Sequence, residues 1–170
     1  MKVGVLASGE GTNLQALLDS LHGREIEVVA VACDQPSARA LERAQAAGVP
    51  SRVFLRSEFG ARAARDAAMG DWLAEQGVEL VVLAGYMAIL DAAFVARFRD
   101  RILNVHPSLL PAFPGVRAIE QALDHGVKVF GVTVHFVDEG VDSGPVIFQR
   151  AVELPEPHDA NAVREALRPI

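Results

Sequence analysis

Residues 2–13 read Lys-Val-Gly-Val-Leu-Ala-Ser-Gly-Glu-Gly-Thr-Asn, and this stretch points to the fold class. Lys2–Ala7 is a short and almost wholly apolar run, which is typical of a strand that is buried on both faces. A loop with two glycines follows, and four leucines from Leu14 to Leu21 then recur at helical spacing. A buried strand that leads through a glycine loop into a helix is typical of a parallel α/β sheet.

The rest of the chain continues this alternation and then changes character. We expect further strands at Glu27–Cys33, Ser51–Leu55, Leu80–Ala84, Ile102–His106, Val129–Val137 and Val146–Val152, and helices at Ala38–Ala47, Ala61–Gln76, Arg117–Asp124 and Ala160–Leu167. The predicted fold is α/β, with a Rossmann-like, mostly parallel sheet, helices on both faces and antiparallel strands in the C-terminal part. Because no linker or repeat interrupts the pattern, we expect residues 1–170 to form a single domain.

Composition excludes several classes of protein. The 170 residues carry 16 basic and 22 acidic side chains, a net charge of −6, which argues against a nucleic-acid binder. There is no apolar run of about 18 residues, so we expect no membrane segment. The single cysteine, Cys33, cannot form an internal disulfide, and no Cys/His spacing predicts a metal site. We therefore expect a cytoplasmic, metal-free protein.

The glycine loop is the first candidate binding site. Gly9 and Gly11 precede a predicted helix, whose N-terminal N–H groups and dipole favour an anion. A dinucleotide fingerprint would need a third glycine near Leu14, whereas Asp34 stands where a ribose-binding acid would lie. A single phosphate or phosphosugar therefore fits better than a dinucleotide, and a plain tight turn is the structural alternative.

The strongest local signal is Asn104-Val105-His106-Pro107. Residues i and i+2 of a strand share a face, so Asn104 and His106 are expected to point the same way. An amide can stabilise an oxyanion and an imidazole can move a proton, and together they suit acyl transfer. A hydrogen-bonded, half-buried histidine is the alternative without a functional role.

A second polar set follows on the Val129–Val137 strand. Thr133 and His135 share one face, and a loop rich in glycine and acidic residues then contains Asp142. A carboxylate near His106 would favour the imidazolium form of that ring. Acidic side chains in such a turn are otherwise solvated.

Four segments together resemble a known family. Residues 8–15, 83–87, 104–115 and 131–147 read SGEGTNLQ, LAGYM, NVHPSLLPAFPG and GVTVHFVDEGVDSGPVI. In this order they resemble the phosphoribosylglycinamide formyltransferases, which are folate-dependent enzymes of purine synthesis. The resemblance covers nearly the whole chain.

This resemblance implies a reaction and a set of site residues. The amine of glycinamide ribonucleotide would attack the formyl carbon of 10-formyltetrahydrofolate, a cosubstrate. Asn104 would stabilise the oxyanion, His106 would transfer protons, and Asp142 would orient His106, with His135 lining the same cleft. The residues that match the ribonucleotide phosphate site are Gly11, Thr12 and Asn13. Those that match the folate site are Arg62, Met87, Ala88, Ile89, Leu90, Asn104, Asp138, Glu139, Gly140, Val141 and Asp142.

The chain also departs from the family pattern. Ala88 stands where some members carry arginine, and Arg117 and Ile119 replace histidines of some relatives. Family members continue with a further helical segment that helps to form the substrate site, and we expect the residues here to end before it. The protein is expected to be a monomer or a homodimer.

Three other functions remain open. A formyltetrahydrofolate hydrolase would use a similar Asn-His-Asp set with water as acceptor, but would carry a small regulatory domain before the first strand. A methionyl-tRNA formyltransferase would add an RNA-binding domain and a more basic surface. A non-catalytic nucleotide-binding module would leave Asn104, His106 and Asp142 without a role.

Overall fold

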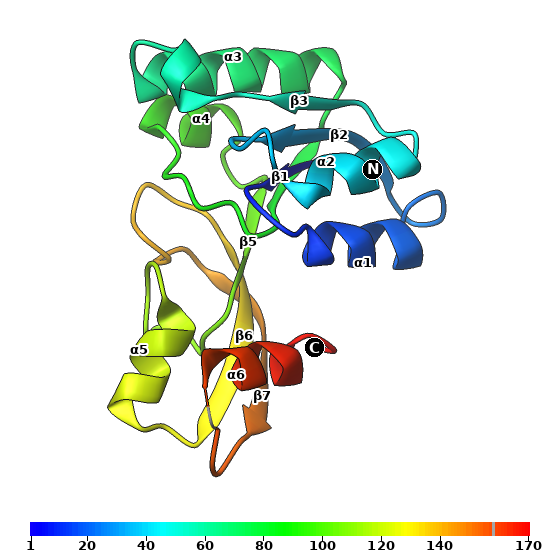
Figure 1. Ribbon diagram of the computed structural model, residues 1–170. Coiled ribbons are helices and arrows are strands. Elements are labelled where there is room, and N and C mark those ends of the chain that lie inside the picture. The colour runs from blue at the N-terminus through cyan, green and yellow to red at the C-terminus, as the bar shows by residue number, and fades with distance from the viewer. Residues whose placement is uncertain (158) are drawn as a thin grey trace. The chain divides into compact units, whose positions relative to one another are not determined.

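The computed structural model describes residues 1–157 and 159–170, and Figure 1 labels its elements. The chain divides into two compact units, residues 1–103 and residues 104–170. Strand β5 (Ile102–His106) carries the chain from the first unit into the second. None of the helices in the described residues is both long and apolar enough to span a membrane.

The first unit is a parallel α/β unit. Its strands lie in the order β3-β2-β1-β4, and the β1–β2, β1–β4 and β2–β3 pairs are all parallel. The elements are β1 (Lys2–Ala7), α1 (Thr12–Ser20), β2 (Glu27–Cys33), α2 (Arg39–Ala46), β3 (Ser51–Val53), the 3₁₀ turn η1 (Arg56–Glu58), α3 (Arg62–Glu75), β4 (Leu80–Leu83) and α4 (Ala92–Arg97). Apart from η1 and α4, which were not predicted, the predicted order of strands and helices is confirmed here, with bounds that differ by at most two residues.

Helices cover both faces of these four strands. Val3 and Val5 of β1 pack in one apolar cluster with Leu14 of α1 and residues of α2. Gly4 points to the opposite face, where a Cβ would lie 3.1 Å from Cδ2 of Leu73 in α3. Figure 1 accordingly shows α3 above the strands and α1 below them. Because both faces of β1 are covered, almost every residue of this strand is apolar.

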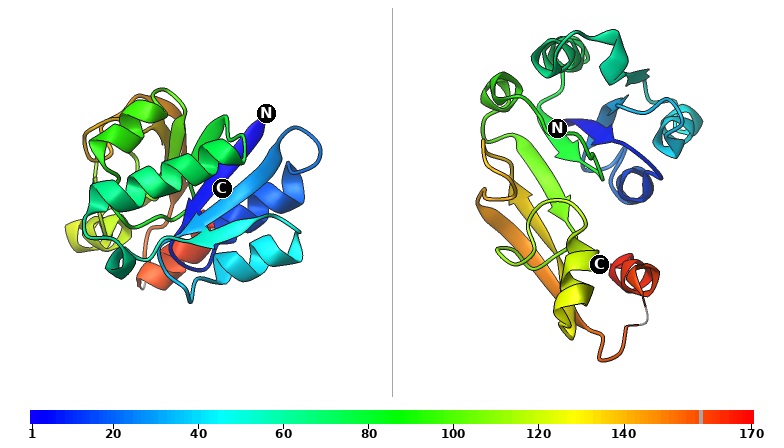
Figure 2. Two further views of the ribbon diagram at one scale, coloured as in Figure 1. Left: turned by 90° about the horizontal axis from the view of Figure 1, so that it is seen from above. Right: turned by 60° about the vertical axis from the view of Figure 1, so that its left-hand side comes forward.

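The second unit is a smaller, antiparallel arrangement. Its strands follow the order β5-β6-β7, and β6 (Val129–Phe136) pairs antiparallel with β7 (Val146–Glu153). Helices α5 (Ala118–His125) and α6 (Ala160–Leu167) supply Ile119, Val163 and Leu167 to a cluster around Phe130. Figure 2 shows α6, in red, against one face of these strands. The predicted antiparallel C-terminal strands are confirmed.

The sequence patterns do not predict helix α4. Asp91 caps it, since its side chain accepts a hydrogen bond from the N–H of Ala93 at 3.0 Å. The helix has six residues, fewer than two turns, so its propensity alone cannot stabilise it. Burial of Phe94 and Val95 supplies the stabilisation instead.

The turn between β1 and α1 depends on Gly11. This residue has φ of 68°, and a Cβ there would lie 2.8 Å from Cα of Ala40 in α2. Gly48 also has φ of 68°, but a Cβ at that position would meet no atom of the described residues within 4 Å. An alanine at either position would therefore suffer the same backbone strain, but only an alanine at Gly11 would also overlap α2.

Substituting Gly11 by alanine should destabilise the protein more than the same change at Gly48. A left-handed alanine costs roughly 1–2 kcal/mol at either position, and Gly11→Ala adds overlap with α2. Urea unfolding of both variants measures the difference in the free energy of unfolding. Equal losses would contradict the close packing of α2 on this turn.

Candidate active site

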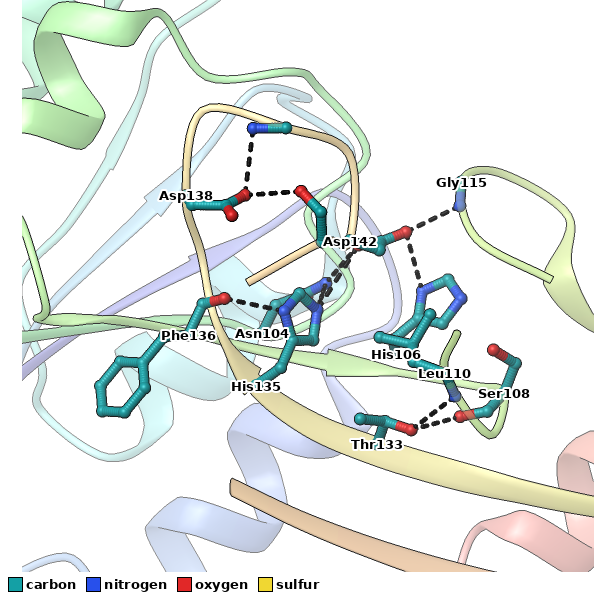
Figure 3. A network of polar contacts seen from close by, with 12 residues as sticks. Asn104, His106, Ser108, Leu110, Gly115, Thr133, His135, Phe136, Asp138 and Asp142 are labelled. Carbon is teal, nitrogen blue, oxygen red and sulfur yellow. Dashed lines mark hydrogen bonds and ion pairs between the residues drawn. The ribbon is translucent and has the colours of Figure 1, made fainter. Parts of the chain in front are cut away.

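Asp142 is the centre of a polar network in the second unit (Figure 3). Its Oδ1 accepts a hydrogen bond from Nδ2 of Asn104 at 3.2 Å and lies 3.5 Å from Nε2 of His135. Its Oδ2 accepts from the N–H of Gly115 at 2.7 Å and lies 3.3 Å from Nδ1 of His106. The structure therefore brings together the predicted catalytic residues Asn104, His106 and Asp142 and the predicted cleft residue His135.

The loop that carries Asp142 is closed by its own contacts. The carboxylate of Asp138 accepts hydrogen bonds from the N–H of Gly140 at 3.0 Å and the hydroxyl of Ser143 at 2.9 Å. Gly144 lies so close to the carbonyl of Phe136 that a Cβ would overlap it. The Asp138 carboxylate therefore stabilises the conformation of the loop that carries Asp142.

His106 is buried, and both of its ring nitrogens face acceptors. Nε2 lies 2.9 Å from the carbonyl oxygen of Phe113, which can only accept, so Nε2 carries a hydrogen. Nδ1 faces the Asp142 carboxylate on the other side of the ring. A doubly protonated imidazolium satisfies both contacts, whereas a neutral ring would direct a lone pair at the carboxylate.

The proline-rich loop that supplies the Phe113 carbonyl is fastened to β6. The hydroxyl of Thr133 donates to the carbonyl of Ser108 at 2.6 Å and accepts from the N–H of Leu110 at 3.1 Å. Gln149 of β7 donates to the same hydroxyl at 3.0 Å. Thr133, which the strand pattern placed beside His135, therefore holds the loop that positions His106.

His135 can adopt two protonation states within this network. Its Nδ1 donates to the carbonyl of Phe136 at 2.8 Å, and its Nε2 lies 3.2 Å from Nδ2 of Asn104. When Nε2 is neutral it accepts from Asn104, and when it is protonated it can donate to Asp142 instead. Protonation of His135 thus releases the Asn104 amide from one of its two partners.

The pKa values of His135 and Asp142 move in opposite directions. Burial alone would lower the pKa of His135, but the Asp142 hydrogen bond, the Phe136 carbonyl and the charges of Asp142 and Asp138 raise it overall. Burial alone would raise the pKa of Asp142, but hydrogen bonds from His135 and Gly115 and the charges of His106 and His135 lower it overall. Each charged form therefore stabilises the other.

The residues predicted to hold a phosphate lie at the start of α1 in the first unit. Gly11 is the N-cap, Thr12 is exposed and Asn13 is half-buried. In the described chain no side chain caps this helix, so its first N–H groups point out of the helix without an intrahelical partner. A helix start of this kind is suited to an anion.

The first-unit residues predicted to bind folate lie on α3 and on the loop between β4 and α4. Arg62 begins α3 and is exposed. Met87 and Ile89 are 62% and 65% exposed, while Leu90 is half-buried and Ala88 lies between them. Two outward apolar side chains on a short loop give a surface suited to an apolar ring.

Polar contacts fix this loop at both ends. The hydroxyl of Ser8 accepts from the N–H of Met87 at 2.8 Å, and the N–H of Ser8 donates to the carbonyl of Gly85 at 3.1 Å. At the other end, Asp66 accepts from the N–H of Asp91 at 2.7 Å while its second oxygen pairs with Arg65. Ser8 therefore connects the glycine loop to the predicted folate loop.

The remaining predicted folate residues lie in the Asp142 loop of the second unit. Glu139, Gly140 and Val141 are exposed, and Val141 leaves 60% of its surface in solvent. Within residues 1–157 and 159–170, no cluster of His, Cys, Asp and Glu could hold a metal ion. Cys33 is buried, and burial together with the charge of Asp34 raises the pKa of its thiol to about 12, which makes it a poor nucleophile.

Comparison with known proteins identifies the family. The family model described as formyl transferase matches residues 1–169. The chain belongs to the formyl transferase family. This formyl transferase is 44% identical over 160 residues to the phosphoribosylglycinamide formyltransferase of Bacillus subtilis (strain 168), a match that covers 93% of this chain and 82% of the relative.

Two further matches extend the comparison of this formyl transferase. It is 44% identical over 170 residues to the trifunctional purine biosynthetic protein adenosine-3 of Drosophila melanogaster, a match that covers 98% of this chain but 13% of that protein. The crystal structure of glycinamide ribonucleotide transformylase 1 from Symbiobacterium toebii matches with a TM-score of 0.96 and 47% identity, covering 99% of this chain and 81% of that one. The predicted fold class and family are thereby confirmed.

Sequence reasoning did not find three contributors to the site. The Phe113 carbonyl and the Gly115 N–H are backbone groups: every residue type has the carbonyl, and every type except proline has the N–H. The sequence therefore predicts a stiff, proline-rich loop here but not which of its backbone groups contact the site. Ser8 belongs to a motif of the family, but its link to Met87 joins residues 79 positions apart. Only the folded chain brings such groups together.

The wild-type protein should be more stable than Asp142→Asn mainly between about pH 4 and pH 6.5, the ordinary pKa values of Asp and His. The pKa of Asp142 is lowered in the folded state, so its contribution is lost as pH falls through that lowered value. The pKa of His135 is raised, so its contribution is lost as pH rises through that raised value.

Urea unfolding of both proteins between about pH 3 and pH 9 measures this difference, a range that brackets the ordinary pKa values of both groups. Glu139→Gln, which neutralises an exposed carboxylate of the same loop, is the control and should show no such dependence. A difference between wild type and Asp142→Asn that stays constant over this range would contradict the pairing.

Proposed function

We propose that this protein transfers the formyl group of 10-formyltetrahydrofolate to the amine of glycinamide ribonucleotide in purine biosynthesis. The observation that carries this proposal is the contact of one carboxylate, Asp142, with both Asn104 and His106 in a member of the formyl transferase family. The names of the bacterial relatives supply the acceptor. 10-Formyltetrahydrofolate is the formyl donor, as a cosubstrate, and residues 1–170 act as the catalytic domain.

The reaction needs one net proton movement and no covalent enzyme intermediate. The amine nitrogen attacks the formyl carbon, and negative charge develops on the formyl oxygen of a tetrahedral intermediate. The bond from that carbon to the folate nitrogen then breaks. Because the amine loses a proton and the folate nitrogen gains one, a single proton-transfer group can serve both steps.

Asn104 and His106 divide this work. The Asn104 amide donates to the oxyanion when one of its N–H groups is released from His135, which protonation of His135 favours. The imidazolium of His106 stabilises the same charge, and it reaches the substrate by exchanging its contact with the Phe113 carbonyl. His106 gives its proton to the folate nitrogen and takes up the one that the amine loses, and Asp142 keeps the ring oriented and balances its positive charge whenever it is protonated.

Different groups of residues are assigned to the two substrates. Gly11, Thr12 and Asn13 hold the ribonucleotide phosphate at the start of α1. Arg62 attracts the carboxylates of folate, Met87, Ala88, Ile89 and Leu90 supply apolar contacts, and the Asp138–Asp142 loop supplies the folate contacts of the second unit. We further propose that the protein acts in the cytoplasm, as a monomer or a homodimer, without binding nucleic acid or membranes.

Formyl transfer should depend strongly on the Asp142 network. Replacing His106 by alanine removes the proton-transfer group, and we expect kcat to fall by roughly 10²–10⁴-fold. Asp142→Asn should also lower kcat, because the ring then loses the partner that orients it. The assay follows formation of formylated ribonucleotide, and Asp124→Asn, an exposed carboxylate on α5, is the control that should retain full activity.

The same assay separates the alternative functions. Wild-type kcat in both His106→Ala and Asp142→Asn would refute the assigned roles. Release of formate at the same rate without the ribonucleotide would identify a hydrolase. Binding of the ribonucleotide without any turnover would identify a nucleotide-binding module.

A further inference from the structure

Two residues of helix α2 donate hydrogen bonds to backbone carbonyls of the glycine loop in the first unit. The N–H of Ala40 donates to the carbonyl of Gly9 at 3.1 Å. The Nε of Arg43 donates to the carbonyl of Glu10 at 2.8 Å. Two successive peptide groups of the loop are therefore oriented by one neighbouring helix.

This orientation determines where the N–H groups of the loop point. In a trans peptide the C=O and the N–H point in opposite directions. Since the carbonyls of Gly9 and Glu10 face α2, the N–H groups of Glu10 and Gly11 face away from it. They extend the row of N–H donors that begins at the first turn of α1, and such consecutive N–H groups form an anion-binding concavity.

Arg43 also ties the loop to α1 itself. Its Nη1 donates to Oε1 of Gln15 in the first turn of α1 at 2.8 Å, and Gln15 in turn donates to Asp19 at 2.8 Å. The guanidinium belongs to a half-buried residue and is therefore less screened by solvent than a surface charge. Arg43 thus fixes the spacing between loop and helix and adds positive charge beside them.

Arg39, one turn earlier on α2, provides a matched comparison. Its Nη1 pairs with the Glu10 carboxylate at 3.0 Å, and the two side chains are 60% and 65% exposed. This contact holds a side chain, whereas the contact of Arg43 holds the Glu10–Gly11 peptide group. An exposed pair of this kind contributes little to stability.

We propose that Arg43 is a positioning residue for the phosphate of the acceptor substrate. It holds the Glu10 carbonyl so that the Gly11 N–H faces the phosphate, and it raises the positive potential at the start of α1. This inference rests on the proposed function, which assigns Gly11, Thr12 and Asn13 to the ribonucleotide phosphate. The sequence motifs did not include Arg43.

The test compares an acceptor with and without its phosphate. In Arg43→Met, the KM for glycinamide ribonucleotide should rise on the order of tenfold, the loss expected for a charge-assisted hydrogen bond. The KM for 10-formyltetrahydrofolate and kcat should stay within about twofold of wild type. With glycinamide riboside, which lacks the phosphate, kcat/KM should be the same in both proteins.

Two control variants sharpen the result. Arg39→Met removes a cation from the same helix and should leave every parameter within about twofold of wild type. Arg43→Lys keeps the charge but has no planar fork to reach both Glu10 and Gln15, so its KM should lie between those of wild type and Arg43→Met.

Three outcomes would overturn the proposal. The first is an unchanged KM for the ribonucleotide in Arg43→Met. The second is an equal loss of kcat/KM with both acceptors, which would indicate a general structural role. The third is measured by binding alone.

If wild type transfers no formyl group, the proposed function fails but the inference about Arg43 can still be tested. Calorimetric titration of wild type and Arg43→Met with the ribonucleotide alone then still tests the inference, and equal affinities would refute it.

Discussion

The polar network of the second unit depends on one carboxylate that four polar groups approach. Asp142 would be costly to place where it lies, since only 13% of its side chain is exposed. Two imidazoles, an amide and a backbone N–H offset that cost, and the imidazoles together with the backbone N–H lower the pKa of Asp142 despite burial. In return, Asp142 fixes His106 from β5 and His135 from β6. Removing this single charge would leave all four partners without a common acceptor.

The two substrates present an electrostatic problem that the protein solves locally. Both are anionic, while the chain carries a net charge of −6. Long-range attraction therefore cannot guide them, and short-range donors must. In the function proposed here, the N–H groups at the start of α1 bind the ribonucleotide phosphate without a formal charge. The proposed roles of Arg43 and Arg62 add a cation at each binding site, which would make the acidic surface compatible with anion binding.

Much of the fold could be predicted from the sequence because its strands are apolar and its helices periodic. Lys2–Ala7, Glu27–Cys33 and Ile102–His106 have the predicted bounds. Helix α4 could not be predicted, since it is short and stabilised by the burial of Phe94 rather than by pattern. In the site, the alternation of a strand predicted that Asn104 and His106 share one face. Their contact with Asp142 could not be predicted, because it depends on how the loop folds. Backbone contributors such as the Phe113 carbonyl leave no trace in residue type.

If the Asp142 network works as the geometry indicates, Asp142 acts through the imidazole of His106 and not on the substrate itself. A double-mutant cycle in formyl transfer, with His106→Ala, Asp142→Asn and the double variant, measures this coupling. We predict strong non-additivity: once His106 is absent, removing the Asp142 charge should lower kcat/KM much less than it does in wild type. Additive losses, with the double variant reduced by the product of the two single effects, would contradict this role of Asp142.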